Sequence, residues 1–399
     1  MNRKILILGI TGGIAAYKVP DLISRIRKHG IAVEVIMTKA AAEFVTPLTI
    51  REVSQNPVHL GMFENNTEWN VEHIALAQKA DLLAVIPATA NIIGKIANGI
   101  ADDLLTSTIL ATKAPKLIAP AMNTGMYENP IFQKNLALLK NSGFHIVGPD
   151  SGKLLCGDVG KGRLAPLDEL EFEIQRIFTV QDLTNETLLV TAGGTREPLD
   201  PVRYIGNRSS GKMGHALAEA ALKRGAKVIL VSTSENAPFH QGMETFQVET
   251  TAAMHECVTT NAGRASIIIK AAAPADFRPA TSYHQKIKKN DEGLTLSLVL
   301  NPDILLELGQ KKQPDQILVG FAAETESLRE NALTKLRRKN LDMIIGNLVN
   351  IPGTGMGADS NKVTIYTKDQ TRELPELPKV VLANQILDCI LEYKQEMRQ

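Results

Sequence analysis

The sequence contains little cysteine, and no cysteine pair has a spacing that would suggest chemistry. Cys156, Cys257 and Cys389 are the three cysteines in 399 residues, and no CxxC pattern occurs. A disulfide framework and a thiolate zinc site are therefore excluded. Sparse, unpaired cysteines are typical of proteins from a reducing compartment, so we expect a cytoplasmic protein.

Aromatic residues and an excess of charge of one sign are also missing. Aromatic side chains make up 4% of the sequence, with Trp69 as the one tryptophan. Lys and Arg number 44 against 43 for Asp and Glu, which leaves a net charge of +1. A base-stacking surface and the basic footprint of a general nucleic-acid binder are both absent, so we expect no nucleic-acid partner.

Long hydrophobic runs are the third absence. No stretch approaches the roughly 18 apolar residues that a transmembrane helix needs, so we expect no membrane partner. Residues 4–9 form an apolar run of strand length, and the helical pattern after it carries Lys18, Arg25 and Lys28. We interpret this run as a first buried strand and not as a signal peptide, whose apolar segment is longer and free of such charges.

What the sequence does contain is an alternation of short apolar runs with longer helical patterns. Such runs are typical of strands in a parallel sheet that is covered on both faces. They lie at 4–9, 33–37, 81–86, 116–119 and 145–147, and again at 188–191, 228–231, 267–269, 317–321 and 343–345. Helical patterns lie at 14–29, 91–111, 131–142, 213–224 and 380–394. The alternation predicts an α/β fold built from βαβ units.

The alternation pauses over residues 149–187 and then restarts with a strand, a glycine turn and a helix. Domains commonly contain roughly 100–200 residues, so a chain of this length has room for two. We therefore predict two Rossmann-like domains, one over residues 1–185 and one over residues 186–399, each with a parallel sheet.

The first glycine turn has the form of a phosphate site. Gly12 and Gly13 lie between the first strand and the first helix, where backbone N–H groups can approach a phosphate. The pattern is not GxGxxG, and the second strand ends at Thr38 with no acid to hold a ribose 2′-hydroxyl. This favours a mononucleotide such as FMN over NAD, with Gly12, Gly13 and Thr38 near the phosphate. A tight turn without a ligand is the alternative.

A second glycine segment, Gly206–Met213, nearly matches the Walker A pattern. Its last position is Met213, whereas a P-loop needs Ser or Thr there to hold Mg²⁺, and the segment does not follow a strand directly. We reject the Walker interpretation. The segment is expected to open a helix, and whether its amides also hold an anion stays open.

Several motifs in order along the chain carry a resemblance to a known family. In the first half they are His73-Ile-Ala-Leu-Ala, Pro87-Ala-Thr-Ala-Asn91, Pro120-Ala-Met-Asn123 and Cys156-Gly-Asp-Val-Gly-Lys-Gly-Arg163. In the second half they include Asn207-Arg-Ser-Ser-Gly-Lys-Met-Gly214, Lys286-Ile-Lys-Lys289, Asn301-Pro-Asp-Ile304 and Gly320-Phe-Ala-Ala-Glu-Thr325. The chain resembles the bifunctional phosphopantothenoylcysteine decarboxylase and phosphopantothenate–cysteine ligase of bacterial coenzyme A biosynthesis.

For the first half, the resemblance implies a flavodoxin-like FMN domain that decarboxylates phosphopantothenoylcysteine. Cys156 would donate the proton to the enethiolate, and His73 would act as the base or orient the substrate carboxylate. Asn123 would hydrogen-bond that carboxylate. Thr89 and Asn91, beyond the strand 81–86, lie where open α/β sheets bind ligands and are assigned to FMN. Cys257 and Cys389 lie in helical patterns and are interpreted as inert.

For the second half, the resemblance implies a parallel-sheet CTP-binding domain that forms an acyl-cytidylate, which cysteine then attacks. Lys286 would be the strongest triphosphate ligand, in a cluster with Lys288 and Lys289, although a lysine run is more often a solvated surface. Asn207 would handle the acyl intermediate. Mg²⁺ is expected with the triphosphate, but no ligand set can be recognised in the sequence. The expected CTP-binding residues are Lys270, Ala271, Ala272, Asp276, Lys286, Pro302, Asp303, Ile304, Leu305, Phe321, Lys335 and Lys339.

The partners implied by the resemblance are 4′-phosphopantothenate, cysteine and CTP, together with further copies of the chain in a dodecamer built from trimers and dimers. Two other function classes stay open. One is a flavin or nicotinamide oxidoreductase whose second domain only binds substrate, and the lack of an acid after either second strand disfavours NAD. The other is a non-catalytic flavoprotein subunit, which would not need the intact motifs around Cys156 and His73.

Overall fold

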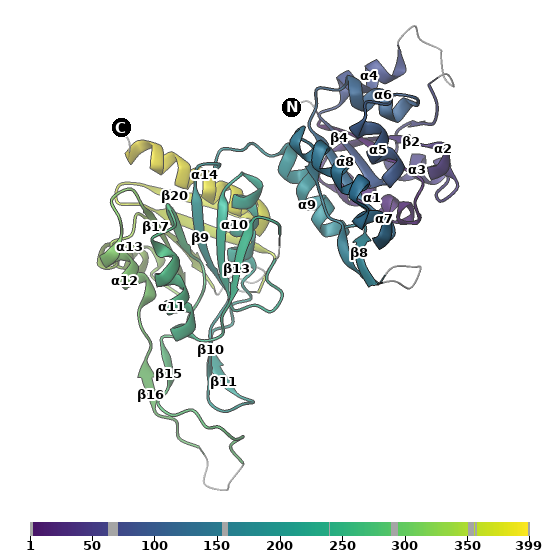
Figure 1. Ribbon diagram of the computed structural model, residues 1–399. Helices are drawn as coiled ribbons and strands as arrows, with labels where there is room; N and C mark the ends of the chain where they lie inside the picture. Colours follow the sequence, from purple (N-terminus) through teal and green to yellow (C-terminus); the bar gives the residue numbers. More distant parts are fainter. Residues whose placement is uncertain are drawn as a thin grey trace. The chain divides into compact units, whose positions relative to one another are not determined.

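A computed structural model describes residues 3–62, 71–153, 159–238, 240–288, 294–349, 355 and 357–397. The chain forms two compact units, Met1–Val180 and Gln181–Gln399, each with its own central sheet (Figure 1). The sequence predicted a domain boundary between residues 185 and 186, and the structure divides the chain between Val180 and Gln181. None of the described helices, including the 19-residue α14 (Lys379–Met397), is long and apolar enough to cross a membrane.

The first unit has a six-stranded parallel sheet with the order β3-β2-β1-β4-β5-β6. Its strands are β1 (Ile5–Ile10), β2 (Ala32–Met37), β3 (Val58–His59), β4 (Leu82–Ala88), β5 (Lys116–Pro120) and β6 (His145–Ile146). The chain moves outward in one direction from β1 to β3 and in the other from β4 to β6. The order therefore reverses between β1 and β4, the place where open α/β sheets bind ligands.

Helices cover both faces of this sheet, which explains why its central strands β1, β2, β4 and β5 are largely apolar. Residues Leu6 and Leu8 of β1 face one core with α1, α3 and α9, whereas Ile7 faces a second core with α4, α5, α6 and α8. The helical elements are η1 (Ile14–Lys18), α1 (Val19–Lys28), α2 (Lys39–Ala42), α3 (Pro47–Ser54), α4 (Glu72–Lys79), α5 (Ala90–Ala97), α6 (Leu104–Ala111), α7 (Thr124–Glu128), α8 (Pro130–Asn141) and α9 (Leu167–Phe178).

Two predicted helices of the first unit are each divided. Residues 14–29 form a 3₁₀ turn and then α1, because Pro20 occupies the first turn of a new helix. Residues 91–111 form α5 and α6, which are separated at Gly99, a residue with φ of 69°. Asp103 then begins α6 with a capping box in which its side chain accepts the Thr106 N–H.

The second unit has an eight-stranded sheet with the order β13-β12-β9-β14-β17-β18-β19-β20. The first six strands are parallel and repeat the order of the first unit, and the last two are antiparallel additions. The strands are β9 (Thr187–Ala192), β12 (Lys227–Ser232), β13 (Met243–Gln247), β14 (Ile267–Lys270), β17 (Ile317–Glu324), β18 (Met343–Leu348), β19 (Ser360–Tyr366) and β20 (Thr371–Pro378). The prediction of an α/β fold with two Rossmann-like sheets is confirmed.

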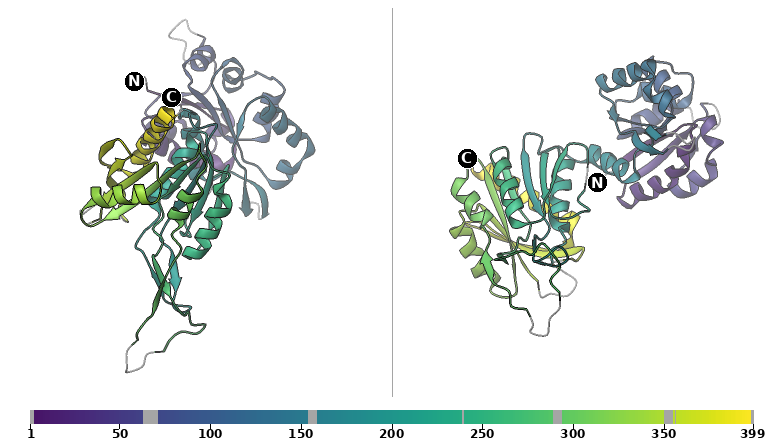
Figure 2. Two further views of the ribbon diagram at one scale, coloured as in Figure 1. Left: turned by 90° about the vertical axis from the view of Figure 1, so that its left-hand side faces the viewer. Right: turned by 60° about the horizontal axis from the view of Figure 1, so that its bottom comes forward.

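Helices again lie on both faces of the second sheet. α11 (Thr251–Ala262), α12 (Ile304–Lys311) and α13 (Leu328–Arg338) share one core with Ile268 and Leu318, while α10 (Lys212–Lys223) packs with α14. Two short antiparallel ribbons leave the sheet from the ends of β9 and β14, as Figure 2 shows. They are β10 (Arg196–Pro198) with β11 (Tyr204–Gly206), and β15 (Phe277–Pro279) with β16 (Leu298–Leu300).

Candidate functional sites

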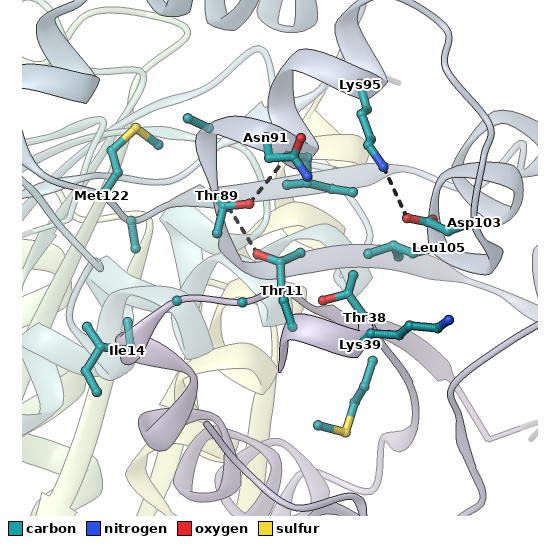
Figure 3. A pocket seen from close by; sticks show the side chains of 18 of the residues that line it. Thr11, Ile14, Thr38, Lys39, Thr89, Asn91, Lys95, Asp103, Leu105 and Met122 are labelled. Atoms are coloured by element: carbon teal, nitrogen blue, oxygen red, sulfur yellow. Dashed lines mark hydrogen bonds and ion pairs between the residues drawn. The ribbon is translucent and has the colours of Figure 1, made fainter. Parts of the chain in front are cut away.

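The larger cavity, of about 1450 Å³, lies at the carboxyl ends of β1, β2, β4 and β5, where the order of the first sheet reverses (Figure 3). A small-molecule site commonly has a volume of roughly 300–1,000 Å³, so this cavity has room for a cofactor and a substrate side by side. It brings together six residues that the sequence singled out: Gly12, Gly13, Thr38, Thr89, Asn91 and Asn123.

Threonine side chains tie the loops of this cavity together. Thr11 Oγ1 donates to the Pro87 carbonyl oxygen at 2.6 Å and accepts the Thr89 N–H at 3.1 Å, which joins the turn after β1 to the turn after β4. Thr38 and Thr89 each cap a helix, through the N–H groups of Ala41 and Ile92. Figure 3 shows the side chains of Thr11, Thr38 and Thr89 close to one another on the lining of the cavity. The capping bonds fix the helix N-termini that face the cavity.

The first glycine turn is pressed against the start of α2. A Cβ at Gly12 would collide with the Cβ of Ala40 and lie 3.0 Å from the Ala40 carbonyl carbon. A side chain is therefore excluded, and the backbone of the turn stays open toward the cavity. Apolar side chains of Ile14, Leu105 and Met122 form other parts of the wall. Backbone amides and hydroxyls at one part and apolar walls at another fit a flavin mononucleotide.

The rim of this cavity is more basic than the sequence indicated. Lys18, Lys39 and Arg163 line it, and burial together with the neighbouring Arg163 lowers the pKa of Lys18. Lys95 also lines it, but its ammonium is paired with Asp102 at 2.8 Å. Within the described part of the chain, Lys18, Lys39 and Arg163 form no ion pair, so they suit anionic ligands. Only Arg163 belonged to a recognised motif, and no role was predicted for it.

The second cavity, of about 730 Å³, lies at the carboxyl ends of β14, β17 and β18, beside the point where the strand order reverses between β9 and β14. An isolated bridge between Gly194 and Ala273 continues the β9–β14 pairing beyond the strands and forms part of this end. The cavity brings together eleven of the twelve expected CTP-binding residues: Lys270, Ala271, Ala272, Asp276, Pro302, Asp303, Ile304, Leu305, Phe321, Lys335 and Lys339.

Comparison with known proteins gives matches over both units. Residues 1–179 match the family described as Flavoprotein, and residues 183–393 match the DNA/pantothenate metabolism flavoprotein C-terminal domain. The coenzyme A biosynthesis bifunctional protein CoaBC of Bacillus subtilis (strain 168) is 46% identical over 395 residues, which cover 98% of this chain and 97% of that protein. The chain belongs to the CoaBC family.

A second full-length relative agrees with this. The CoaBC protein of Escherichia coli (strain K12) is 43% identical over 392 residues, which cover 97% of each chain. Among solved structures, the C-terminal domain of a coenzyme A biosynthesis bifunctional protein CoaBC is 40% identical and covers 55% of this chain and 98% of that one, with a TM-score of 0.46. The family resemblance read from the sequence is confirmed by the full-length relatives.

The predicted proton-transfer residues of the CoaBC decarboxylase do not all meet in the first cavity. Asn123 lines it and caps α7, its Oδ1 accepting the Gly125 N–H at 2.8 Å. His73 lies at the start of α4, partly buried, and is not among the lining residues. Cys156 lies outside the described residues, between β7 (Asp150–Lys153) and β8 (Val159–Arg163), an antiparallel pair that the sequence did not predict.

The hairpin strand β8 is fixed to the segment that carries Asn123. The Met122 N–H donates to the Gly162 carbonyl oxygen at 2.8 Å, and a Cβ at Gly162 would collide with the Met122 carbonyl oxygen. Glycine is required for this close approach. Residues 160–163 of the predicted motif therefore belong to β8, which packs against the segment of Asn123. This packing brings Arg163 to the rim of the cavity.

Basic side chains of the second cavity are held by fixed partners. Lys339 Nζ pairs with Asp303 at 2.9 Å, and Lys335 Nζ pairs with Glu324 at 2.6 Å. Burial would raise the pKa of Asp303, but hydrogen bonds from Lys339 and the Leu306 N–H outweigh it and lower the pKa. Asp303 thus caps α12 and orients Lys339. Arg338, Lys212 and Lys379 also line the cavity, and the sequence patterns did not single them out as ligands.

Two predicted residues of the ligase half lie outside the lining of the second cavity. Asn207 is exposed, and its Nδ2 donates to the carbonyl oxygens of Ala273 and Pro274 at 3.1 and 2.9 Å, so it borders the cavity wall. Lys286 is exposed on the segment after β15. Its neighbour Ile287 is anchored on the β10–β11 connection, where its N–H donates to Asp200 at 3.1 Å and its carbonyl accepts from Arg203.

The expected Mg²⁺ has no protein-only site in the described part of the chain. Within the described ranges, no three His, Cys, Asp or Glu side chains gather as a metal centre requires. Mg²⁺ commonly binds through one or two carboxylates together with substrate phosphates.

Proposed function

We propose that the chain ligates cysteine to 4′-phosphopantothenate with CTP, through an acyl-cytidylate, and then decarboxylates the product to 4′-phosphopantetheine with FMN. The observation that carries this proposal is the presence of two separate cavities, each at or beside the reversal point of its own sheet. One has a glycine turn and apolar walls, and the other has a set of lysines. Different linings suit two different cofactors and therefore two reactions.

In the first unit, Gly12, Gly13 and Thr38 would hold the FMN phosphate, and Thr89 and Asn91 would contact the rest of the cofactor. FMN, when bound, supplies the electron transfer that loss of CO₂ from a cysteinyl substrate requires. The chain's own residues then orient the substrate and move protons. The Asn123 amide binds the substrate carboxylate, His73 accepts or directs a proton, and Cys156 donates one.

In the second unit, the lysines would neutralise the triphosphate while the substrate carboxylate attacks its α-phosphorus and pyrophosphate leaves. Lys335 and Lys339 face the cavity from adjacent turns of one helix end, and Phe321 offers an apolar surface for the base. Asn207, beside the cavity wall, would bind the acyl intermediate when the amine of cysteine displaces CMP. Mg²⁺ would enter on the triphosphate.

We also propose that the protein is a homo-oligomer in the cytoplasm, a dodecamer in the arrangement that the family resemblance implies. Two predicted site residues support association. His73 is expected to act in the first cavity and Lys286 in the second, yet neither lines the corresponding cavity of its own chain. The β15–β16 ribbon near Lys286 exposes apolar side chains, with Phe277 48% and Leu300 71% exposed. Exposed apolar side chains on a ribbon are typical of a contact surface between subunits.

Mixing two inactive variants tests the shared ligase site. If Lys286 acts in the cavity of a second copy, re-associated Lys286→Gln and Lys339→Met chains form mixed pairs with one intact site. Statistical mixing then restores about a quarter of the wild-type ligation rate. The measurement is pyrophosphate release by each variant alone and after mixing. No recovery, with mixed oligomers demonstrated by mass, would show that Lys286 acts within its own chain.

A Gly12→Ala substitution should abolish flavin retention. The added Cβ collides with Ala40, so the turn or α2 must shift away from the cavity. Displacing a preorganised phosphate cradle should weaken FMN binding by about 100-fold or more. Gly94→Ala is the matched control, because its Cβ would meet only Asn135 at an ordinary 3.8 Å. The ratio of flavin absorbance to protein in the purified variants gives the answer, and equal ratios in both would contradict the assignment.

The ligase half is tested by nucleotide turnover. With 4′-phosphopantothenate and cysteine present, we expect the protein to release CMP and pyrophosphate in equal amounts. Without cysteine it should release pyrophosphate only until the sites are filled with acyl-cytidylate. Replacing CTP by ATP measures nucleotide choice directly. Release of phosphate and CDP would point to an acyl-phosphate and overturn the proposed intermediate.

A further inference from the structure

Arg163 reaches the first cavity because strand β8 contains one extra residue. Arg163 lies opposite Asp150 in the β7–β8 pair, and Lys161 lies opposite Ser151, so Gly162 is the extra residue of a β-bulge. In a regular strand, Lys161 and Arg163 would share a face. A bulge re-aims the side chain that follows it, and Arg163 lines the cavity whereas Lys161 does not. The bulge therefore directs one of two neighbouring cations to the cavity.

The bulge is fixed by the segment that carries Asn123. The φ of Gly162 is 148°, in the region that favours glycine, and its carbonyl oxygen accepts the Met122 N–H at 2.8 Å. A Cβ at Gly162 would lie 2.3 Å from the Met122 carbonyl oxygen. The backbone that carries Arg163 is thus held against the same wall as Asn123.

Lys18 meets Arg163 at this cavity from a different segment. It is the last residue of η1, and its half-buried side chain lines the cavity with Nζ 5.9 Å from the ring centre of Tyr17. Burial, and after it the charge of Arg163, lowers the pKa of Lys18, while Asp150 acts in the opposite direction. The Asp150 carboxylate accepts the Ser151 N–H at 2.7 Å, and within the described ranges it forms no ion pair with either cation.

Two neighbouring cations repel each other, so an anion with two charges would complete this place in the cavity. A phosphate monoester carries close to two negative charges at neutral pH and offers three acceptor oxygens. The planar guanidinium of Arg163 can bind two of these oxygens, and the ammonium of Lys18 can bind the third. Lys39 is a different case, because it directly follows Thr38 and therefore lies beside the expected FMN phosphate.

We propose that Lys18 and Arg163 bind the 4′-phosphate of the decarboxylase substrate and thereby select the phosphorylated form. The inference rests on the proposed function, in which FMN and phosphopantothenoylcysteine share this cavity. FMN also carries a phosphate, but its expected cradle is the turn at Gly12 and Gly13. Lys18 lies at the far end of η1 from that turn, roughly 10 Å along the helix axis.

The carboxylate of the substrate is a poorer match for two cations. Decarboxylation removes that charge as CO₂, so cations that stabilise the carboxylate would bind the substrate more tightly than the transition state. The neutral amide of Asn123, to which the carboxylate is assigned, avoids this cost. The phosphate keeps its charge throughout the reaction. Lys18 and Arg163 would therefore stabilise the bound substrate and the transition state equally.

Decarboxylation of two substrates tests the inference. Phosphopantothenoylcysteine and pantothenoylcysteine, which differ only in the phosphate, are supplied to the full-length, FMN-loaded protein, and CO₂ release gives KM and kcat for each. The wild type should have an about 100-fold lower KM for the phosphorylated substrate. Lys18→Met and Arg163→Met should each raise that KM by about tenfold or more with little change in kcat. Both variants should match the wild type with pantothenoylcysteine.

Lys161→Met is the matched control, because Lys161 is an exposed cation two residues from Arg163 on the same strand and does not line the cavity. It should behave as the wild type with both substrates. Arg163→Lys keeps the charge but loses the planar fork. Its KM for phosphopantothenoylcysteine should lie between those of the wild type and Arg163→Met, a graded recovery that a merely structural role would not produce.

Bound flavin distinguishes the two sources of phosphate. Each variant should keep the wild-type ratio of flavin absorbance to protein. Loss of flavin in Lys18→Met and Arg163→Met, but not in Lys161→Met, would assign the two cations to the cofactor phosphate and overturn the inference. An equal rise in KM for both substrates, or equal KM values in the wild type, would also overturn it. Failure of the flavin-loaded wild type to decarboxylate either substrate would instead remove the proposed function.

Discussion

A Lys339→Met variant should lose nucleotide-dependent ligation by about 10²–10³-fold, the loss typical of removing one preorganised charge from a developing anion. Lys339 is oriented by Asp303 at 2.9 Å and lines the second cavity. In the proposed reaction its ammonium would lie beside the triphosphate, where negative charge accumulates. Methionine keeps the length and apolar stem of the side chain, so the change removes the charge with little loss of packing.

The same variant should decarboxylate added phosphopantothenoylcysteine at the wild-type rate, because the first cavity lies in the other unit. Lys311→Met removes a lysine of the adjacent helix α12 that pairs with Glu307 on the surface, and it should leave both rates unchanged. Pyrophosphate and CO₂ release measured on each variant separate the two activities. Equal loss of both rates in Lys339→Met would contradict the assignment of one activity to each unit.

A Cys156→Ser variant should show the opposite pattern. Ligation should continue, while 4′-phosphopantetheine formation falls by about 10²–10⁴-fold, the range expected when a positioned proton donor is replaced by a much weaker acid. Phosphopantothenoylcysteine, or the decarboxylated species that awaits a proton, should accumulate and be visible by mass. Bound flavin should be retained, because none of the residues assigned to FMN is changed.

Cys257→Ser is the control for loss of a thiol. Cys257 lies in α11 of the second unit, and burial raises the pKa of its thiol, which keeps it protonated and unreactive at neutral pH. This variant should keep both activities. Unchanged product formation by Cys156→Ser, or an equal loss in Cys257→Ser, would remove the proposed role of Cys156.

Most of both central sheets could be predicted because a parallel strand covered on two faces must be apolar along its length. The run 81–86 was predicted as a strand from its residues alone, and the observed strand β4 (Leu82–Ala88) is buried at every position. The ribbons were missed for the opposite reason. Val159–Arg163 alternates glycine with valine, lysine and arginine, which is not the pattern of a core strand. Leu298–Leu300 is apolar, but it has only three residues and all three are exposed.

Some residues of the two candidate sites could likewise be predicted from the sequence, and others could not. Gly12, Thr38 and Thr89 follow strands directly, and position after a parallel strand is visible in the sequence. Arg163 and Lys379 reach their cavities from distant segments, through the docking of β8 and the start of α14, and no local pattern encodes such meetings. His73 and Lys286 were assigned from the family resemblance, and the motifs that carry it do not show whether one chain or two assemble the site.

The most direct test of the central claim follows all products of one reaction by mass. Purified protein is incubated with 4′-phosphopantothenate, cysteine and CTP, with each component omitted in turn. We predict 4′-phosphopantetheine, CO₂, CMP and pyrophosphate from the complete mixture, phosphopantothenoylcysteine in the Cys156→Ser reaction, and no coupled product without CTP. Formation of neither phosphopantothenoylcysteine nor 4′-phosphopantetheine by flavin-loaded, folded protein would contradict the assignment of a ligase and a decarboxylase to this chain.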